Sequence, residues 1–378
     1  MKRYSSRFFF FILLILLCSC NYSIQPSIDN SSTTSSSSAD SSLLPITLPS
    51  SAYILNFCDD DILFCQQTND EDSMSQTLYH YRISTKKTTQ LCEFSLSNMC
   101  GELSVLNKNT LYLLDGNNIL MIDISSGASS ILAQLDSKSC YSSIALSTNN
   151  LILHSILENS EGLTYLIEAI HLPDGARHTI TRSHYKDGIG TAISCITTEN
   201  DDIYTYEVII SPLSTKYQIV SYNVDGTCIA HYSLDMTDFI PETNTIAQDS
   251  VVSIQKRNNC YILSTINSRT KIFAQNSNIL QSLSIPNALF CDFPGNYHTL
   301  PQDDSSFPYI YLTPNSNDLP IFCVNTNDLS ISEIHISRLP SANSTTWYRS
   351  TKSSLLFHPT SSEETNDNDS PFFIFDAS

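Results

Sequence analysis

Basic residues, glycine and long hydrophobic runs are all scarce in this sequence of 378 residues. The chain has 19 Lys and Arg against 38 Asp and Glu, so its formal net charge is −19. A surface this acidic is unsuited to phosphate backbones, which excludes nucleic acid as a partner. The apolar run from Phe8 to Leu17 has ten residues, about half of the roughly 20 that a bilayer-spanning helix needs.

The residues that build a hydrophobic core are abundant. Hydrophobic residues make up 41% of the chain and include 19 Tyr and 17 Phe, whereas disordered proteins have few aromatic and branched residues. Only 15% of the residues are charged, against about a quarter in average soluble proteins. We therefore expect a sizeable folded domain with an unusually uncharged surface.

The N-terminus has the pattern of a secretory signal. Lys2, Arg3 and Arg7 precede the short apolar run, and a basic segment followed by such a run is typical of exported proteins. The segment Leu17-Cys18-Ser19-Cys20 follows directly. We therefore predict that residues 1–19 are a signal peptide.

The same segment resembles the lipoprotein box of bacterial lipoproteins, in which an aliphatic and two small residues precede a cysteine. In that family the signal is cut before the cysteine, whose sulfur carries diacylglycerol. The resemblance implies lipidation of Cys20, because the preceding Ser19 is small, whereas Cys18 follows a bulky Leu17. A cysteine inside the box, Cys18, departs from the usual pattern, and an ordinary signal peptide with incidental cysteines is the alternative.

Residues 20–44 are rich in serine and threonine and show no hydrophobic periodicity. Such a composition is typical of a flexible tether. Loss of residues 1–19 also removes three basic side chains, which changes the net charge from −19 to −22. The implied location is the extracytoplasmic face of a cell membrane, with a lipid anchor as the contact to that membrane.

Residues 45–378 repeat one pattern of four short apolar segments separated by turns. The clearest copy, Leu103 to Leu135, contains Leu103–Leu106, Leu111–Leu114, Ile119–Ile124 and Ile131–Leu135. Its turns include Asp115-Gly116, a pair that favours tight hairpins. Four short strands joined in this way predict an antiparallel meander.

The copies recur at a regular interval. The middles of the predicted third strands are Tyr81, Ile122, Ile170, Tyr222, Phe273, Val324 and Ile374. Their spacings are 41, 48, 52, 51, 51 and 50 residues. Four strands every 40–50 residues are typical of a β-propeller. We predict an all-β fold, a β-propeller with seven four-stranded blades; six or eight blades are the alternatives.

The last predicted blade has only three strands after residue 344, namely Thr345–Arg349, Ser354–His358 and Pro371–Ala377. A missing fourth strand leaves an open sheet edge. The short apolar segment Leu44 to Leu48 precedes the first blade and is otherwise unassigned. We predict that it supplies the outer strand of the seventh blade and closes the ring.

The whole chain resembles a bacterial lipoprotein that carries an extracytoplasmic propeller, although the resemblance is one of architecture. Trp347 is the sole tryptophan, so the Trp-Asp marks of WD repeats are missing. The regular Gly and Trp pattern of quinone-dependent dehydrogenase propellers is missing as well. Asn and Ser stand in many turns where other propellers place Gly.

Ten cysteines remain after Cys18 and Cys20, mostly within predicted strands and without any CxxC pair. The missing CxxC pair makes a zinc or thioredoxin-like site improbable. Cysteine can act here as a small apolar residue. An exported chain with an even count also permits disulfides, and Cys58 and Cys65 flank a turn across which they would pair.

The candidate metal ligands are three histidines, His171, His178 and His184, and three acidic turns. The histidine spacings of seven and six residues do not suit a local metal site. The acidic turns Asp59–Asp61, Asn69–Asp72 and Asp367–Asp369 lack the Gly and the distal Glu of a calcium loop. We therefore predict no metal site and no cofactor.

No motif in the sequence identifies a catalytic centre. It has no Gly-x-Ser-x-Gly elbow, phosphate-binding loop or dinucleotide fingerprint, so the catalytic residues, if any, are unknown. The preferred interpretation is a monomeric, non-enzymatic module that binds a ligand, an envelope protein or a carbohydrate. The alternative is a cell-surface polysaccharide hydrolase or lyase with paired carboxylates in the propeller funnel. The loops Pro294–Ser306 and Pro359–Ser370 are the candidate contact surfaces.

Overall fold

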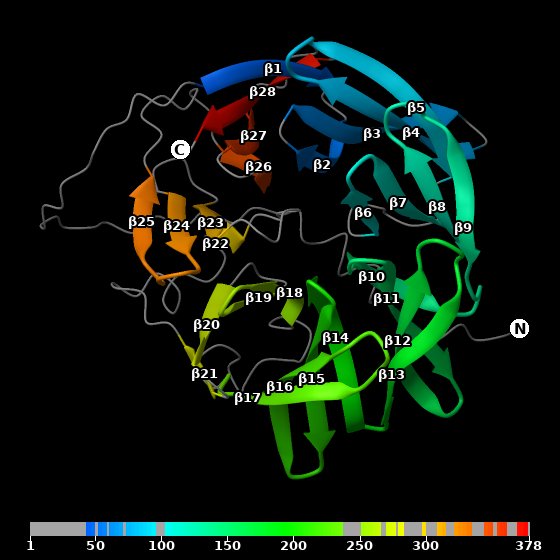
Figure 1. Ribbon diagram of the computed structural model, residues 1–378, viewed down its shortest axis with the longest axis vertical. Coiled ribbons are helices and arrows are strands. Elements are labelled where there is room, and N and C mark those ends of the chain that lie inside the picture. The colour runs from blue at the N-terminus through cyan, green and yellow to red at the C-terminus, as the bar shows by residue number, and fades with distance from the viewer. Residues whose placement is uncertain are drawn as a thin grey trace, which may run out of the picture. The chain divides into compact units, whose positions relative to one another are not determined.

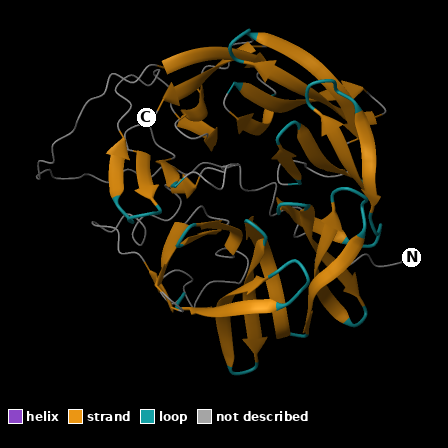
Figure 2. Ribbon diagram, in the orientation of Figure 1, coloured by secondary structure: helices purple, strands orange, loops and turns teal. Residues whose placement is uncertain are grey.

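All regular structure in the described part of the chain is β-strand, and no helix occurs there (Figures 1 and 2). It follows that no helix in this part has the length and apolar character needed to cross a membrane. The computed structural model describes residues 43–49, 52–58, 60–70, 73–95, 103–236, 251–265, 270–276, 279–282, 297–299, 308–314, 321–334, 344–350, 354–360 and 369–376.

Strands β2 to β17 form two four-stranded sheets and one sheet of eight. The four-stranded sheets contain β2 (Tyr53–Cys58), β3 (Asp61–Asp70), β4 (Ser73–Arg82) and β5 (Lys87–Ser95), and then β6 (Ser104–Asn107), β7 (Thr110–Asp115), β8 (Asn118–Asp123) and β9 (Ser129–Gln134). The sheet of eight contains β10 (Cys140–Leu146), β11 (Asn150–Asn159), β12 (Gly162–His171), β13 (Arg177–Lys186), β14 (Ile189–Glu199), β15 (Asp202–Ser211), β16 (Ser214–Tyr222) and β17 (Cys228–Leu234).

Three further four-stranded sheets follow. They contain β18 (Val251–Arg257), β19 (Cys260–Thr265), β20 (Thr270–Asn276) and β21 (Ile279–Ser282); β22 (Tyr297–Thr299), β23 (Tyr309–Pro314), β24 (Ile321–Asn325) and β25 (Ile331–Ile334); and β26 (Ser344–Ser350), β27 (Ser354–Thr360) and β28 (Asp369–Asp376) together with β1 (Leu43–Pro49). All neighbouring strands pair antiparallel, as hairpin connections require.

The seven residues that marked predicted third strands lie on every fourth strand of the chain. They fall on β4, β8, β12, β16, β20, β24 and β28. The all-β prediction with antiparallel meanders is therefore confirmed. The strand that pairs with β23 is β22, which lies inside the predicted loop Pro294–Ser306. The described residues of the other loop, Pro359–Ser370, end β27 and begin β28.

The sheet of eight arises because two groups of four strands join through a hairpin. β13 and β14 pair only at Tyr185↔Gly190 and Lys186↔Ile189. The two residues between them, Asp187 and Gly188, have φ values of 52° and 83°. Two consecutive left-handed residues form the tight turn that matches the twist of a hairpin. The repeat pattern predicts two separate groups of four strands here, and this hairpin is not among its predicted turns.

The N-terminal strand β1 pairs along its whole length with the C-terminal strand β28, from Leu43↔Phe375 to Pro49↔Asp369. Its burial alternates over its second half, where Ile46 and Leu48 are buried whereas Pro45 and Thr47 are exposed. This is the period of a strand with one face on the core. The strand begins at Leu43, two residues before the predicted start of the folded domain at residue 45.

Among the described residues, the hydrophobic core forms seven clusters, and each lies between two successive groups of strands. One cluster joins the last group to the first, because Leu356, Phe372 and Ile374 pack with Ile54 and Phe64. Figure 1 shows these two groups next to each other. The last group of strands therefore packs against the first.

Central strands contribute to a cluster on each face. On β19, Tyr261 and Leu263 belong to one cluster, and Cys260 and Ile262 to the next. A strand buried on both faces reads as a continuous apolar run rather than an alternating one. This explains the uninterrupted segments, such as Leu111–Leu114, that the sequence analysis used to find the repeats.

Glycines in three turns hold neighbouring groups close together. Gly127, Gly175 and Gly226 each precede a fourth strand and have φ values of 72°, 70° and 88°. A Cβ at Gly175 would lie 2.3 Å from the carbonyl oxygen of Leu132 in the preceding group. The other two glycines meet Leu91 and Ile180 in the same way, at 2.8 Å and 2.6 Å.

The carbonyls that these glycines approach belong to β-bulges. Leu91, Leu132 and Ile180 are each the extra residue at a register shift between a third and a fourth strand. A bulge leaves its extra residue out of the ladder, so a turn of the next group can approach it. Only glycine combines the positive φ with the space that this contact requires.

Candidate functional site

The lipidation site predicted at Cys20 lies outside the described residues, as do residues 1–42 as a whole. The signal peptide 1–19 and nearly all of the tether 20–44 thus remain predictions. The residues that the structure does describe place several titratable side chains between the sheets.

The cysteines of the described strands are mostly small core residues. Cys195, Cys260 and Cys323 are buried thiols, and burial raises the pKa of Cys260 and of Cys323 to about 11. Cys140 and Cys228 are exposed, so burial does not explain every cysteine.

The hairpin disulfide considered for Cys58 and Cys65 is wrong. The register pairs Cys58 with Asp61 and Cys65 with Tyr53. Cys65 is thus four residues beyond the partner of Cys58, about 13 Å at the rise of a strand. A disulfide needs Cα atoms within about 7 Å.

The three clustered histidines do not converge. His171 Nδ1 donates to Asp174 Oδ1 at 2.8 Å in its own turn, and His178 Nε2 donates to the carbonyl oxygen of Val224 at 2.7 Å. His184 lies on the outer part of β13 and is exposed. Within the described ranges, no group of three or more His, Cys, Asp or Glu side chains is placed to hold a metal ion.

The first acidic turn has a structural role. Asp60 accepts hydrogen bonds from the backbone and the hydroxyl of Ser84. Asp61 Oδ1 accepts from His80 Nε2 at 2.7 Å and from Arg82 Nε at 3.2 Å. These carboxylates therefore stabilise the open end of the β3–β4 hairpin, where β3 begins and β4 ends. The side chains of the other two acidic turns lie outside the described residues.

Two carboxylates are buried among the described residues, and each has fixed partners. Glu168 accepts two hydrogen bonds from Arg177 Nη2, at 3.0 Å and 2.9 Å. Glu207 accepts from Thr205, Tyr222 and Gln218 at 2.9, 3.1 and 2.9 Å. Burial, and to a smaller extent the nearby charge of Glu207, raise the pKa of Tyr222 to about 12. Both carboxylates are thus satisfied by the protein itself.

A buried cation lies among tyrosines between the β14–β17 and β18–β21 groups. Lys256 is 4% exposed, and its Nζ donates to Glu199 Oε2 at 3.2 Å. The same nitrogen lies 4.8 Å from the ring centre of Tyr261 and 5.7 Å from that of Tyr204. Cation–π attraction and the ion pair together compensate the cost of burying the charge.

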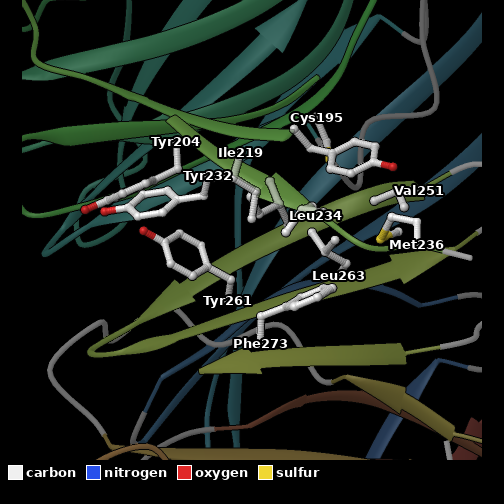
Figure 3. Packing of buried hydrophobic residues seen from close by; sticks show 12 residues of the cluster. Cys195, Tyr204, Ile219, Tyr232, Leu234, Met236, Val251, Tyr261, Leu263 and Phe273 are labelled. Carbon is white, nitrogen blue, oxygen red and sulfur yellow. The ribbon is translucent and has the colours of Figure 1, made fainter. Parts of the chain in front are cut away.

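The hydroxyls of three tyrosines gather at one side of this core cluster. Figure 3 shows Tyr204, Tyr232 and Tyr261 with their oxygens away from Leu263 and Phe273. Gln275 links two of them, since its Nε2 donates to Tyr232 at 2.9 Å and its Oε1 accepts from Tyr261 at 3.4 Å. Burial raises the pKa of Tyr204 and of Tyr261, so both phenols stay neutral at physiological pH.

A second buried polar pair lies in the β10–β13 group. His154 on β11 is fully buried, and its Nδ1 lies 2.6 Å from Ser142 Oγ on β10. Its ring stacks on Tyr165 with centres 6.1 Å apart. Burial lowers the pKa of His154 to about 4, because desolvation disfavours the charged imidazolium. The imidazole is therefore neutral at pH 7.

His154, Glu207 and Lys256 are not among the residues predicted from the sequence, although the first two carry a signal. His154 interrupts the otherwise apolar segment 151–157, and Glu207 interrupts the segment 203–210. Lys256, in contrast, follows the short apolar segment 251–254. A polar residue inside a strand buried on both faces must find a partner in the protein. The identity of that partner depends on the register, which the sequence does not show.

The neutral His154 makes the stability of the fold depend on pH. The unfolded chain binds a proton at this side chain below its ordinary pKa of 6.5, whereas the folded chain does so only below about 4. Stability is thus fully present above pH 6.5 and falls by about 3 kcal/mol between pH 6.5 and 4. His154→Gln is expected to flatten this part of the curve. Chemical denaturation at a series of pH values measures it, and an unchanged slope in the variant contradicts the assignment.

The fold resembles solved β-propellers, whereas no protein-family model and no curated protein matches this chain. An oligogalacturonate lyase in complex with manganese has a TM-score of 0.53 and 10% identity, covering 84% of this chain and 86% of that one. The β-propeller domain of the Trilobed protease from Pyrococcus furiosus, with an open velcro topology, has a TM-score of 0.51 and 9% identity, covering 88% and 95%.

An acylaminoacyl peptidase from Pyrococcus horikoshii also has a TM-score of 0.51, with 9% identity, and covers 82% of this chain and 49% of that one. Similarity at this level of identity shows the fold alone. The chain therefore has a β-propeller fold, and its function has to be argued from its own residues.

Proposed function

We propose that this chain is a seven-bladed β-propeller, closed by β1 and tethered to a membrane through a lipid on Cys20, that binds a ligand or protein partner at the extracytoplasmic face. The seven core clusters, one of which joins the last group of strands to the first, support the blade count and the closure. The pairing of β1 with β28 supports the same closure. The lipoprotein box supports the anchor.

The observation that carries a binding role is the state of the buried carboxylates. Glycoside cleavage by paired carboxylates needs two of them free to act on substrate, one as an acid and one as a base or nucleophile. Glu168 is held by Arg177, and Glu207 by three neutral donors. Their oxygens are engaged in holding strands together, which favours binding over catalysis for the described part of the chain.

The edge of the closing strand supports a monomer. Pro45 and Pro49 are four residues apart on β1, so their backbone nitrogens point to the same side of the strand. Among the described strands, β1 pairs with β28 on one side only. Proline lacks the N–H that a further strand would use, and prolines on an edge strand prevent strand addition. The outer edge of β1 is therefore a poor template for a second copy.

The anchor is tested by comparing two neighbouring cysteines. Cys20→Ser is expected to abolish lipidation and to release the protein from the membrane fraction, because the lipid-bearing sulfur is removed. Cys18→Ser, two residues away, is the matched control and should remain lipidated and membrane-bound. Cell fractionation and mass spectrometry of the N-terminal peptide measure both effects. Equal behaviour of the two variants contradicts the assignment of Cys20.

The binding role is tested separately by recovering partners from detergent-solubilised membranes with the wild-type chain. A specific envelope protein or a carbohydrate that co-purifies at a fixed ratio supports it. Turnover of a polysaccharide by the purified chain, in the absence of any stable partner, contradicts it and favours the hydrolase or lyase alternative.

A further inference from the structure

A β-bulge places two serines opposite one buried histidine in the β10–β13 group. The register between β10 and β11 shifts after Tyr141↔Ser155, and the next pair is Ser143↔His154. Ser142 is thus the extra residue of the bulge, and side chains at a bulge and its partner lie together. Ser142 is half-buried, and His154 has no exposed surface.

The hydrogen bonds of Ser142 determine the tautomer of His154. Ser142 Oγ lies 2.6 Å from His154 Nδ1 and 3.4 Å from the carbonyl oxygen of His154. A hydroxyl has one proton and two lone pairs. Both contacts are satisfied together only when Nδ1–H donates to Oγ and the hydroxyl donates to the carbonyl. The neutral ring then has its lone pair on Nε2.

Two polar atoms at this bulge have no protein partner. His154 Nε2 and Ser143 Oγ are both buried, and within the described part of the chain neither makes a hydrogen bond. More than nine in ten buried polar groups in proteins are satisfied, so each exception calls for an explanation. Here the two exceptions belong to one cross-strand pair.

The chemistry of these two atoms selects the ligand. Nε2 needs a donor, and Ser143 offers a hydroxyl that donates as well as accepts. One hydroxyl group of a ligand donates to the first and accepts from the second. A carboxylate has no proton for Nε2, and a cation would be buried without a counter-charge, which is costly.

The same bulge recurs in other groups, three of which serve for comparison and lack this combination. The extra residues there are Leu55 on β2, Ser194 on β14 and Val252 on β18. The pair next to Ser194 is Cys195↔Tyr206, which has no imidazole. Ser194 is therefore a natural control, since it is a serine at the equivalent position of the adjacent group.

We propose that Ser142, Ser143 and His154 form a binding site for a hydroxyl group of a small neutral ligand, such as a sugar or another polyol. Ser142 positions the imidazole, and the hydroxyl of the ligand bridges His154 Nε2 and Ser143 Oγ. Ser142, on β10, the first strand of its group, is half-buried. This inference specifies a ligand for the binding role proposed above and therefore rests on that role.

The test is an NMR titration of the full chain labelled with ¹⁵N-histidine, observed at pH 7. The His154 signal should show a protonated Nδ1 and an unprotonated Nε2. Glycerol and glucose are the probes, and acetate, which only accepts hydrogen bonds, is the control ligand. A neutral probe should shift the Nε2 resonance saturably, and acetate should not.

Two variants separate binding from a general change in the fold. Ser143→Ala removes one hydrogen bond to the ligand and should weaken binding about tenfold. Ser194→Ala should leave the titration unchanged. Melting curves of both variants establish that the fold is retained.

Three results overturn the proposal: a proton on Nε2 at pH 7, a Nε2 resonance that neither glycerol nor glucose shifts saturably, or equal affinities in the Ser143→Ala variant and the wild type. The second result leaves water as the only partner of these atoms. Failure here is distinct from failure of the anchor or of partner recovery, which are measured by fractionation and co-purification.

Discussion

Deletion of residues 43–49 is expected to remove most of the stability of the propeller. The deletion exposes the edge of β28 and removes Ile46 and Leu48, which are 5% and 1% exposed. Loss of a buried Leu or Ile costs about 2–5 kcal/mol each, and a typical domain has only about 5–15 kcal/mol in total. Thermal melting followed by circular dichroism measures the loss. An unchanged melting curve contradicts closure by β1.

A pair of point substitutions tests the same closure without altering the length of the chain. Leu48→Ala is expected to destabilise by about 3 kcal/mol, because this side chain is fully buried between the first and last groups. Leu44→Ala on the same strand is the control, since Leu44 is 43% exposed. Similar effects at both positions would show that the burial of Leu48 between the first and last groups does not stabilise the fold as described.

Gly175→Ala is expected to destabilise by about 3 kcal/mol, through two additive causes. A left-handed φ costs a residue with a Cβ about 1–2 kcal/mol, and overpacking typically costs a further 1–3 kcal/mol. At Gly175 the φ is 70° and the new Cβ meets the carbonyl oxygen of Leu132 at 2.3 Å. Denaturant unfolding of the purified protein measures the change.

Gly188→Ala separates these two causes. Gly188 has a similar φ of 83°, but nothing lies within 4 Å of a Cβ built there. This variant should lose only the conformational part, about 1 kcal/mol. Gly226→Ala, whose Cβ would lie 2.6 Å from the carbonyl oxygen of Ile180, should behave like Gly175→Ala. If Gly188→Ala costs as much as the other two, the contact between neighbouring groups has no energetic role.

The repeats were predictable because each one combines strong local signals. Central strands are apolar on both faces, so Leu111–Leu114 and its equivalents stand out as continuous runs. Asp-Gly pairs mark several of the turns, since these residues tolerate a positive φ. The same local reasoning indicated that the segment around Ile46 and Leu48 lacked a partner at the start of the chain.

The hairpin between β13 and β14 was not predictable from the same signals. Residues 182–188 are largely polar and exposed, so no apolar pattern marks the last part of β13. The strand forms there because the turn at Asp187 and Gly188 brings Tyr185 and Gly190 together. Main-chain hydrogen bonds, rather than burial, stabilise this part of the sheet.

By itself, the sequence determined the all-β class, the spacing of the repeats and the absence of recognisable catalytic motifs, because these depend on residues close together in the chain. Only the tertiary structure decided which distant groups meet: Lys256 with Glu199, Glu207 with Gln218, and the turn of Gly175 with Leu132. Such pairings depend on strand register and on the distance between facing sheets. A hydrophobic pattern specifies which face of a strand is buried, but not which polar atom lies opposite it.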